Sequence, residues 1–257
     1  MKGNSNMPNM IIQSEGSRAT IEEVSIHYEE TGSGPLAFVH CHGLGGNGDR
    51  FVDEFDFWEE HFSRVITWDN RGLGKSSPAT KYSVPHYASD LVKLLDKLKV
   101  AKVVIHGVSW GGVVAQQFAL DYQERCAAVI IDSSSSEVNL SASENWYRQS
   151  SDAQEGKGDR NIKPEHMESF VAQARATAGL REHPFTPRLK EITCPVLVIG
   201  GGQDSVAGAG GSVVLGRNLP NARTEIVRDA GHGVYRQKPD VFRNLVIDFC
   251  SEHGIIG

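Results

Sequence analysis

Short apolar runs, which suit buried strands, alternate in this chain of 257 residues with longer amphipathic segments that suit helices. For example, the strand-like run KVVIHG at residues 102–107 precedes a helical pattern at residues 111–122. Strands that alternate with helices form a parallel sheet that is covered by helices on both faces. The alternation therefore predicts an α/β fold.

The spacing of apolar residues places the individual strands and helices. An alternating pattern at residues 23–30 predicts an edge strand. The other predicted strands lie at residues 36–40, 64–69, 102–107, 126–132, 194–201 and 222–229, and the predicted helices lie at residues 50–62, 84–100, 111–122 and 239–253. We expect the glycine-rich residues 208–214 to form a flexible loop or the frayed start of a helix.

Residues 133–190 interrupt this alternation. The segment is polar, contains the run SSSS, and has helical patterns but no convincing strand. The helical patterns lie at residues 144–151 and 164–178. We therefore expect a core domain made of residues 1–132 and 191–257, into which residues 133–190 are inserted as a cap over the sheet.

Composition excludes several classes of partner. The chain carries 26 basic and 32 acidic residues, a net charge of −6, which argues against a nucleic-acid or anionic-membrane surface. It has no stretch of 18 apolar residues, and residues 1–10 contain no apolar segment typical of a signal peptide. The four cysteines are widely spaced, which suits buried free thiols. We expect a cytoplasmic monomer or homodimer that binds a small molecule.

Ser109 lies in a Gly-x-Ser-x-Gly pattern, after a predicted strand and at the start of a predicted helix. A nucleophilic serine requires this context, because a sharp turn holds its hydroxyl up at the edge of the sheet. Gly107 and Gly111 lack side chains that would clash where the strand and the helix come close. The alternative is a glycine-rich turn in which the serine is incidental, so the rest of the chain has to supply a base and an acid.

His232 is the candidate base. It lies in the loop RDAGHGVY after the last predicted strand, late in the chain, as the order serine, acid, histidine requires for this type of turn. Two aspartates are candidates for the acid that orients it, and both follow strands: Asp204 in IGGGQDSV and Asp132 in VIIDSSS. We favour Asp204 on topology, although spacing alone does not decide between them.

An oxyanion needs backbone N–H donors beside the nucleophile. We expect one donor to be the N–H of Trp110, which follows the serine. The other is expected from the loop HCHGLGGNG after an early strand, where the N–H of Leu44 is our choice and Gly43 permits the bend. His40 and His42 in this loop have no further ligand cluster nearby in the sequence, so we expect no metal, and His42 is expected to brace the loop.

Five motifs in a fixed order make the chain similar to the α/β-hydrolase superfamily: HCHGLGG, DNRGLGKS, GVSWGG, GGQDSV and DAGHG. The resemblance covers nearly the whole chain except residues 133–190. It implies an eight-stranded, mostly parallel sheet, a cap inserted after the sixth strand, and acyl transfer to water without a cofactor. The serine at the elbow excludes the haloalkane dehalogenase and epoxide hydrolase branches, which use aspartate there.

Within that superfamily the chain resembles small-capped carboxylesterases, enol-lactone hydrolases and N-acyl-homoserine lactone hydrolases. The resemblance implies a serine hydrolase for small or medium uncharged esters or lactones. An N-acyl-homoserine lactone or a short-chain ester is the leading specific expectation. The expected substrate contacts are Gly43, Trp110, Trp146, Tyr147, Met167 and Phe170.

Two other functions stay open at this point. A ligand receptor or signalling protein can use the same fold with slow hydrolysis, because a fold does not determine a function. A C–C bond hydrolase can use the same three residue types.

Overall fold

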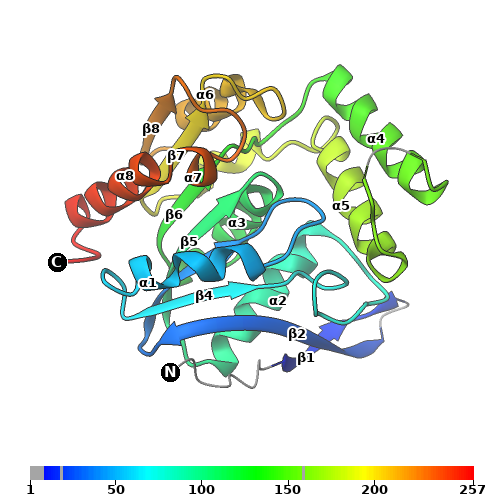
Figure 1. Ribbon diagram of the computed structural model, residues 1–257, viewed down its shortest axis with the longest axis horizontal. Helices are drawn as coiled ribbons and strands as arrows, with labels where there is room; N and C mark the ends of the chain where they lie inside the picture. Colours follow the sequence, from blue (N-terminus) through cyan, green and yellow to red (C-terminus); the bar gives the residue numbers. More distant parts are fainter. Residues whose placement is uncertain (1–8, 18–19, 158–159) are drawn as a thin grey trace.

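One sheet of eight strands lies at the centre of this computed structural model, which describes residues 9–17, 20–157 and 160–257 (Figure 1). The strands are β1 (Asn9–Glu15), β2 (Ile21–Gly32), β3 (Leu36–Cys41), β4 (Arg64–Trp68), β5 (Lys102–Val108), β6 (Cys126–Asp132), β7 (Val196–Gly201) and β8 (Ala222–Val227). Their order across the sheet is β1-β2-β4-β3-β5-β6-β7-β8. Only β2 runs antiparallel to its neighbours β1 and β4, so the predicted mostly parallel sheet is confirmed.

Helices cover both faces of the sheet (Figure 1). They are α1 (Phe55–Trp58), α2 (Val84–Lys97), α3 (Trp110–Asp121), α4 (Leu140–Gln154), α5 (Met167–Gly179), α6 (Gly208–Asn218), α7 (Val234–Gln237) and α8 (Pro239–Glu252). The two layers follow from the period of two along each strand. In β5, Val103 and Ile105 belong to the core layer that contains α2 and α3, whereas Val104 belongs to the layer that contains α1 and α8.

The segment between β6 and β7 contains α4 and α5, and its described residues, 133–157 and 160–190, include no strand. The two helices pack against each other beyond the faces of the sheet (Figure 1). Two hydrogen bonds hold α5 to the loop after β4: Ser169 Oγ donates to the Arg71 carbonyl at 2.7 Å, and Gln173 Nε2 donates to Asn70 Oδ1 at 3.2 Å. These contacts place α5 over one end of the parallel strands.

The first strand and the first helix differ from the sequence predictions. The edge strands are β1 and β8, and β1 pairs with β2, so the prediction that residues 23–30 form an edge was wrong. The alternating burial of β1 shows the same period of two that identified its partner. The helix predicted at residues 50–62 is split into a 3₁₀ helix at Asp49–Glu54 followed by α1. The helical spacing of Phe51, Phe55 and Trp58 still buries all three side chains.

The glycine-rich residues 208–214 form the first part of a regular helix, α6, and not a flexible loop. Packing explains one of its glycines. A Cβ at Gly211 would lie 2.9 Å from Ser135 Cβ and 3.0 Å from the Ser134 carbonyl oxygen, so a larger residue would push α6 away from the loop after β6. Glycine lowers helix propensity, so the sequence pattern alone could not decide between a loop and the start of a helix.

No helix in the described ranges is both long and apolar enough to cross a membrane. The first eight residues, part of the segment that lacks a signal-peptide pattern, lie outside the described residues. All four cysteines are free thiols; Cys41, Cys126 and Cys250 are buried, and Cys194 is half-buried.

Candidate active site

The turn between β5 and α3 holds Ser109 in a strained backbone conformation, with φ of 56° and ψ of −117°. Few residues other than glycine adopt a positive φ, and such strain persists where the surrounding structure enforces it. The enforcing contacts involve the two flanking glycines. A Cβ at Gly107 would lie 2.2 Å from the Gly111 carbonyl oxygen, and a Cβ at Gly111 would lie 2.0 Å from the Cys41 carbonyl oxygen. Strand and helix therefore touch through their backbones, and the serine stands at the carboxyl edge of the sheet.

Ser109 opens into a cavity of about 1250 Å³. Its walls come from the elbow, the loop after β6, α4 and the start of α6. Trp110, Leu44 and Trp146 supply apolar surface, but slightly more than half of the lining residues are polar or charged, including Ser133, Asn139 and Arg181. A cavity of this size and composition accommodates a small molecule that carries several polar groups.

His232 and Asp204 form a hydrogen-bonded pair, and the residues that directly follow Asp204, 205–208, line this cavity. Nδ1 of His232 donates to Oδ2 of Asp204 at 3.0 Å, and the Asp204 side chain is 1% exposed. The other carboxylate oxygen of Asp204 accepts the backbone N–H groups of Val206 at 2.8 Å and Ala207 at 3.0 Å. Burial raises the pKa of Asp204, but the hydrogen bonds from His232, Val206 and Ala207 outweigh burial and lower it.

The carboxylate fixes the tautomer of His232. Since an ionised carboxylate only accepts hydrogen bonds, the proton of the neutral imidazole lies on Nδ1, and Nε2 is free to accept a proton. No hydrogen bond joins Ser109 Oγ to His232 among the hydrogen bonds of the described residues. Hydrogen bonds of this kind are often long before substrate binds and tighten in the reacting complex.

Asp132, the other candidate acid, is fully buried and has different partners. Its carboxylate accepts the N–H groups of Val234 and Tyr235, each at 3.0 Å, and the hydroxyl of Ser133 at 2.8 Å. Burial raises the pKa of Asp132, and these hydrogen bonds oppose the shift. The structure therefore pairs the imidazole of His232 with Asp204.

The loop after β3 approaches the nucleophile closely. A Cβ at Gly43 would lie 3.7 Å from Ser109 Cβ, and Leu44 lines the cavity next to Ser109. A tight turn, in which the Gly46 N–H donates to the Gly43 carbonyl at 3.0 Å, holds this approach. Trp110 is the first residue of α3, so its N–H has no acceptor within the helix.

Four residues predicted as substrate contacts are absent from the lining of the cavity that contains Ser109: Gly43, Tyr147, Met167 and Phe170. Tyr147 is 46% exposed, Phe170 is fully buried against Gly45, and Met167 lines a separate cavity of about 690 Å³. Trp146 does line the Ser109 cavity. Tyr147 lies on the exposed side of α4, although its neighbours Asn145, Trp146 and Arg148 line the cavity. The sequence placed Trp146, Tyr147, Met167 and Phe170 on helices without giving the rotation of each helix.

Sequence reasoning missed a polar network that joins α5 to the elbow. Gln173 of α5 accepts the Gly45 N–H at 2.9 Å through Oε1 and donates to Asn70 Oδ1 through Nε2. The same Asn70 oxygen accepts the indole N–H of Trp110 at 3.0 Å. Asn70 follows β4 within the motif DNRGLGKS, and this position beyond a parallel strand was the available signal.

His42 has both ring nitrogens occupied, as expected for a residue that braces the loop. Nδ1 donates to the Gly43 carbonyl at 2.8 Å, and Nε2 accepts the Asn70 N–H at 3.0 Å. Burial lowers the pKa of His42, which favours this neutral form. Neither nitrogen is available to bind a metal ion.

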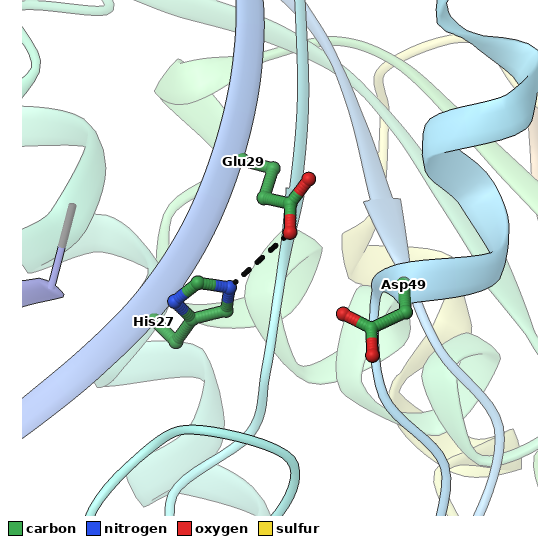
Figure 2. A group of neighbouring side chains, drawn as sticks. All are labelled: His27, Glu29 and Asp49. Carbon is green, nitrogen blue, oxygen red and sulfur yellow. Dashed lines mark hydrogen bonds and ion pairs between the residues drawn. The ribbon is translucent and has the colours of Figure 1, made fainter. Parts of the chain in front are cut away.

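A separate cluster of possible metal ligands consists of His27, Glu29 and Asp49 (Figure 2). Figure 2 shows the contact between His27 Nε2 and Glu29 Oε1, at 3.4 Å. A cation is already present among these groups, because Lys75 Nζ lies 3.1 Å from Asp49 Oδ1 and 3.5 Å from Glu29 Oε1. The lysine ammonium offsets the acidic charge that would attract a metal ion, so we interpret the cluster as an ion-pair network.

The sheet order, the helices on both faces and the strained elbow together define a hydrolase of the α/β type. Comparisons with known proteins agree: residues 37–155 match the family model described as alpha/beta hydrolase fold. The chain is 25% identical to 3-oxoadipate enol-lactonase 2 of Acinetobacter baylyi over 88% of this chain and 93% of the relative. In sequence and in fold, the chain is therefore similar to the α/β-hydrolase superfamily.

Two solved structures illustrate the range of its relatives. A thermophilic esterase from Thermogutta terrifontis superposes with a TM-score of 0.79 at 24% identity, over 96% of this chain and 99% of the esterase. Est816, described as an N-acyl homoserine lactone degrading enzyme, superposes with a TM-score of 0.69 at 26% identity, over 93% of this chain and 100% of Est816. Ester and lactone hydrolysis both occur among proteins with this architecture.

Proposed function

We propose that this enzyme hydrolyses carboxylic esters or lactones through an acyl-enzyme intermediate on Ser109. One observation carries the proposal: the hydrogen-bonded pair His232–Asp204 and the strained elbow of Ser109 occur together at the carboxyl ends of β5, β7 and β8. A nucleophile, a base and a group that orients the base are the parts that acyl transfer requires.

The first half of the reaction forms the acyl-enzyme. Ser109 Oγ attacks the carbonyl carbon of the substrate while His232 Nε2 takes the hydroxyl proton. Asp204 keeps the imidazole in the required tautomer and stabilises the imidazolium. The N–H groups of Trp110 and Leu44 are proposed to bind the developing oxyanion. His232 then gives the proton to the leaving alkoxide oxygen as the ester bond breaks, and in a lactone this oxygen stays attached to the acyl group.

The second half releases the acid. Water attacks the acyl-enzyme carbonyl while His232 takes a proton from that water, and the bond to Ser109 Oγ breaks as the proton returns to it. No redox step or cofactor is needed for this cycle.

We propose that residues 133–190 act as the cap, with residues 1–132 and 191–257 as the catalytic core. The support is that α4 contributes Trp146, Asn145 and Arg148 to the cavity wall, and that α5 contacts the loop which carries Leu44. Polar and apolar residues line the cavity in similar numbers, so it suits an ester or lactone that carries both polar groups and a short apolar acyl chain. Among N-acyl-homoserine lactones, we therefore expect short acyl chains to be preferred.

The test uses Ser109→Ala, with Ser251→Ala on the exposed end of α8 as the matched control. Hydrolysis of p-nitrophenyl acetate and butyrate is expected to fall by at least about a thousandfold in Ser109→Ala and to stay unchanged in Ser251→Ala. A rate near that of the wild type in Ser109→Ala would remove the proposed mechanism.

A substrate panel then separates the alternatives. N-butanoyl- and N-decanoyl-homoserine lactone, γ-butyrolactone and a β-diketone are followed by proton release. We expect many turnovers on the short lactones and esters. A single slow event with retained product would instead indicate a receptor, and cleavage of the diketone alone would indicate a C–C bond hydrolase.

A further inference from the structure

Asp132 contacts both the nucleophile and the loop of the catalytic base. Its backbone carbonyl accepts the Ser109 N–H at 2.9 Å, and its carboxylate accepts the N–H groups of Val234 and Tyr235. In the sheet it lies directly beside Val108, the residue before Ser109. One fully buried residue at the end of β6 is thus bonded to segments that lie 23 residues before it and 102 to 103 residues after it.

Ser133 extends this set of contacts. Its hydroxyl donates to Asp132 Oδ1 at 2.8 Å and accepts the Gly233 N–H at 2.9 Å. Its backbone is strained, with φ of 52°, and it is one of three non-glycine residues with a positive φ in the described part of the chain. Strain of this kind persists only where the surroundings enforce it.

Together, the side chains of Ser133 and Asp132 accept the three consecutive N–H groups that follow His232.

Among the described residues, the Asp132 carboxylate accepts hydrogen bonds from two backbone N–H groups and from the Ser133 hydroxyl. None of these bonds comes from the imidazole of His232. His232 immediately precedes the fixed N–H groups. Its ring is 22% exposed, so the surrounding side chains do not enclose it completely, and the position of its backbone contributes, with the bond to Asp204, to where the ring lies.

We propose that Asp132 is a positioning residue that sets the distance and orientation of His232 relative to Ser109, with Ser133 as its assistant. This inference rests on the proposed function of Ser109 and His232. Asp132 gives up no proton and touches no substrate. It fixes the backbone positions from which the Ser109 hydroxyl and the His232 imidazole extend. A misplacement of about 1 Å is enough to lower a rate about a hundredfold, so such a clamp has a measurable effect.

The test compares Asp132→Asn with Ser133→Ala and Asp204→Asn. In Asp132→Asn the amide nitrogen faces a backbone N–H, so one hydrogen bond is replaced by a contact between two donors. We expect kcat to fall about a hundredfold with KM within about threefold of the wild-type value, because orientation matters most in the transition state. Ser133→Ala removes only the hydroxyl, keeps the buried carboxylate, and should show a smaller fall of the same kind. Asp204→Asn should be the most damaging of the three.

A second readout does not depend on turnover. The Nδ1 proton of His232 gives a low-field resonance in the NMR spectrum while it is bonded to a carboxylate. We expect this resonance to be lost in Asp204→Asn and to persist in Asp132→Asn and Ser133→Ala with faster exchange with water. The folded fraction of each variant is measured by circular dichroism, so that rates refer to folded protein.

Three outcomes would overturn the positioning role. In the first, folded Asp132→Asn and Ser133→Ala keep wild-type kcat and proton exchange and lose only thermal stability. In the second, Asp132→Asn is more damaging than Asp204→Asn and loses the low-field resonance, which would make Asp132 the acid of the triad. In the third, KM rises while kcat is unchanged. If Ser109→Ala stays active, the proposed function fails separately, and the exchange rate of the His232 proton still decides the role of Asp132.

Discussion

His40 Nδ1 lies 3.1 Å from His106 Nδ1 on one face of the sheet, where aromatic rings surround the two side chains. His40 is 1% exposed and His106 is 0% exposed. Burial lowers the pKa of His40 well below its ordinary value, helped by the neighbouring His106, and burial alone lowers the pKa of His106 to about 3. Both rings are therefore neutral in the folded protein, where one Nδ1–H donates to the other Nδ1.

This pair makes the fold sensitive to mild acid. In the unfolded chain both histidines bind protons as the pH falls below about 6.5, whereas the folded protein leaves them neutral down to a much lower pH. The unfolded state then binds more protons, so the free energy of unfolding falls as the pH falls, by about 1.4 kcal/mol per pH unit for each such proton. Urea unfolding at pH 7.5 and 5.5 measures the slope. His106→Gln, which keeps a polar partner for His40, should give a shallower slope, and an unchanged slope would contradict this account.

The close approach of Gly111 to Cys41 predicts opposite effects for two substitutions of glycine by alanine. Gly111→Ala places a Cβ 2.0 Å from a backbone oxygen of β3, so helix α3 has to move, and we expect a loss of at least about 3 kcal/mol in the free energy of unfolding. Gly210→Ala in α6 meets no atom within 4 Å and should stabilise the protein by about 0.4–1 kcal/mol. Urea or thermal unfolding measures both. Equal effects of the two changes would show that backbone contact at the elbow is unimportant.

The hydrogen bonds of Gln173 lead us to expect that α5 influences the rate of hydrolysis without contact between Gln173 and the substrate. Gln173→Leu removes the acceptor of the Gly45 N–H and the donor to Asn70, and leaves the loop next to Leu44 less firmly held. We expect kcat/KM for p-nitrophenyl butyrate to fall about tenfold, in line with the loss of one or two buried hydrogen bonds. Gln154→Leu on the exposed surface of α4 is the matched control and should leave the rate unchanged. Similar rates for both variants would show that the contact of α5 with the loop after β3 does not affect hydrolysis.

Local sequence signals predicted the sheet well because strands and helices differ in period, and these periods are visible within ten residues. The turn at Ser109 was predictable for a similar reason, since two glycines around a serine after an apolar run leave few alternatives. The sequence left residues 208–214 open between a flexible loop and a frayed helix start, because one of their glycines, Gly211, is required by packing against Ser135, a contact that the sequence cannot display.

The sequence left open those features of the site that depend on contacts between residues far apart in the chain. The choice between Asp132 and Asp204 depends on which carboxylate meets the imidazole, and both follow parallel strands at the same edge of the sheet. Their separate partners become visible only once β6, β7 and the loop after β8 are placed together. In the same way, the bond between Gln173 and Asn70 joins residues 103 positions apart, and no local pattern marks such a pair.

The order of elements along the chain separates the strands that carry the proposed catalytic residues from the helices that form part of the cavity wall. Ser109, Asp132, Asp204 and His232 follow or end four strands that are neighbours in the sheet, whereas α4 and α5 enter between β6 and β7 without contributing a strand. Exchanges on the cavity side of α4 therefore leave the register of these four strands, the Ser133 contacts and the Gln173 network intact. Descendants of such a chain can alter the cavity wall through this one helix while they keep the residues of the proposed reaction.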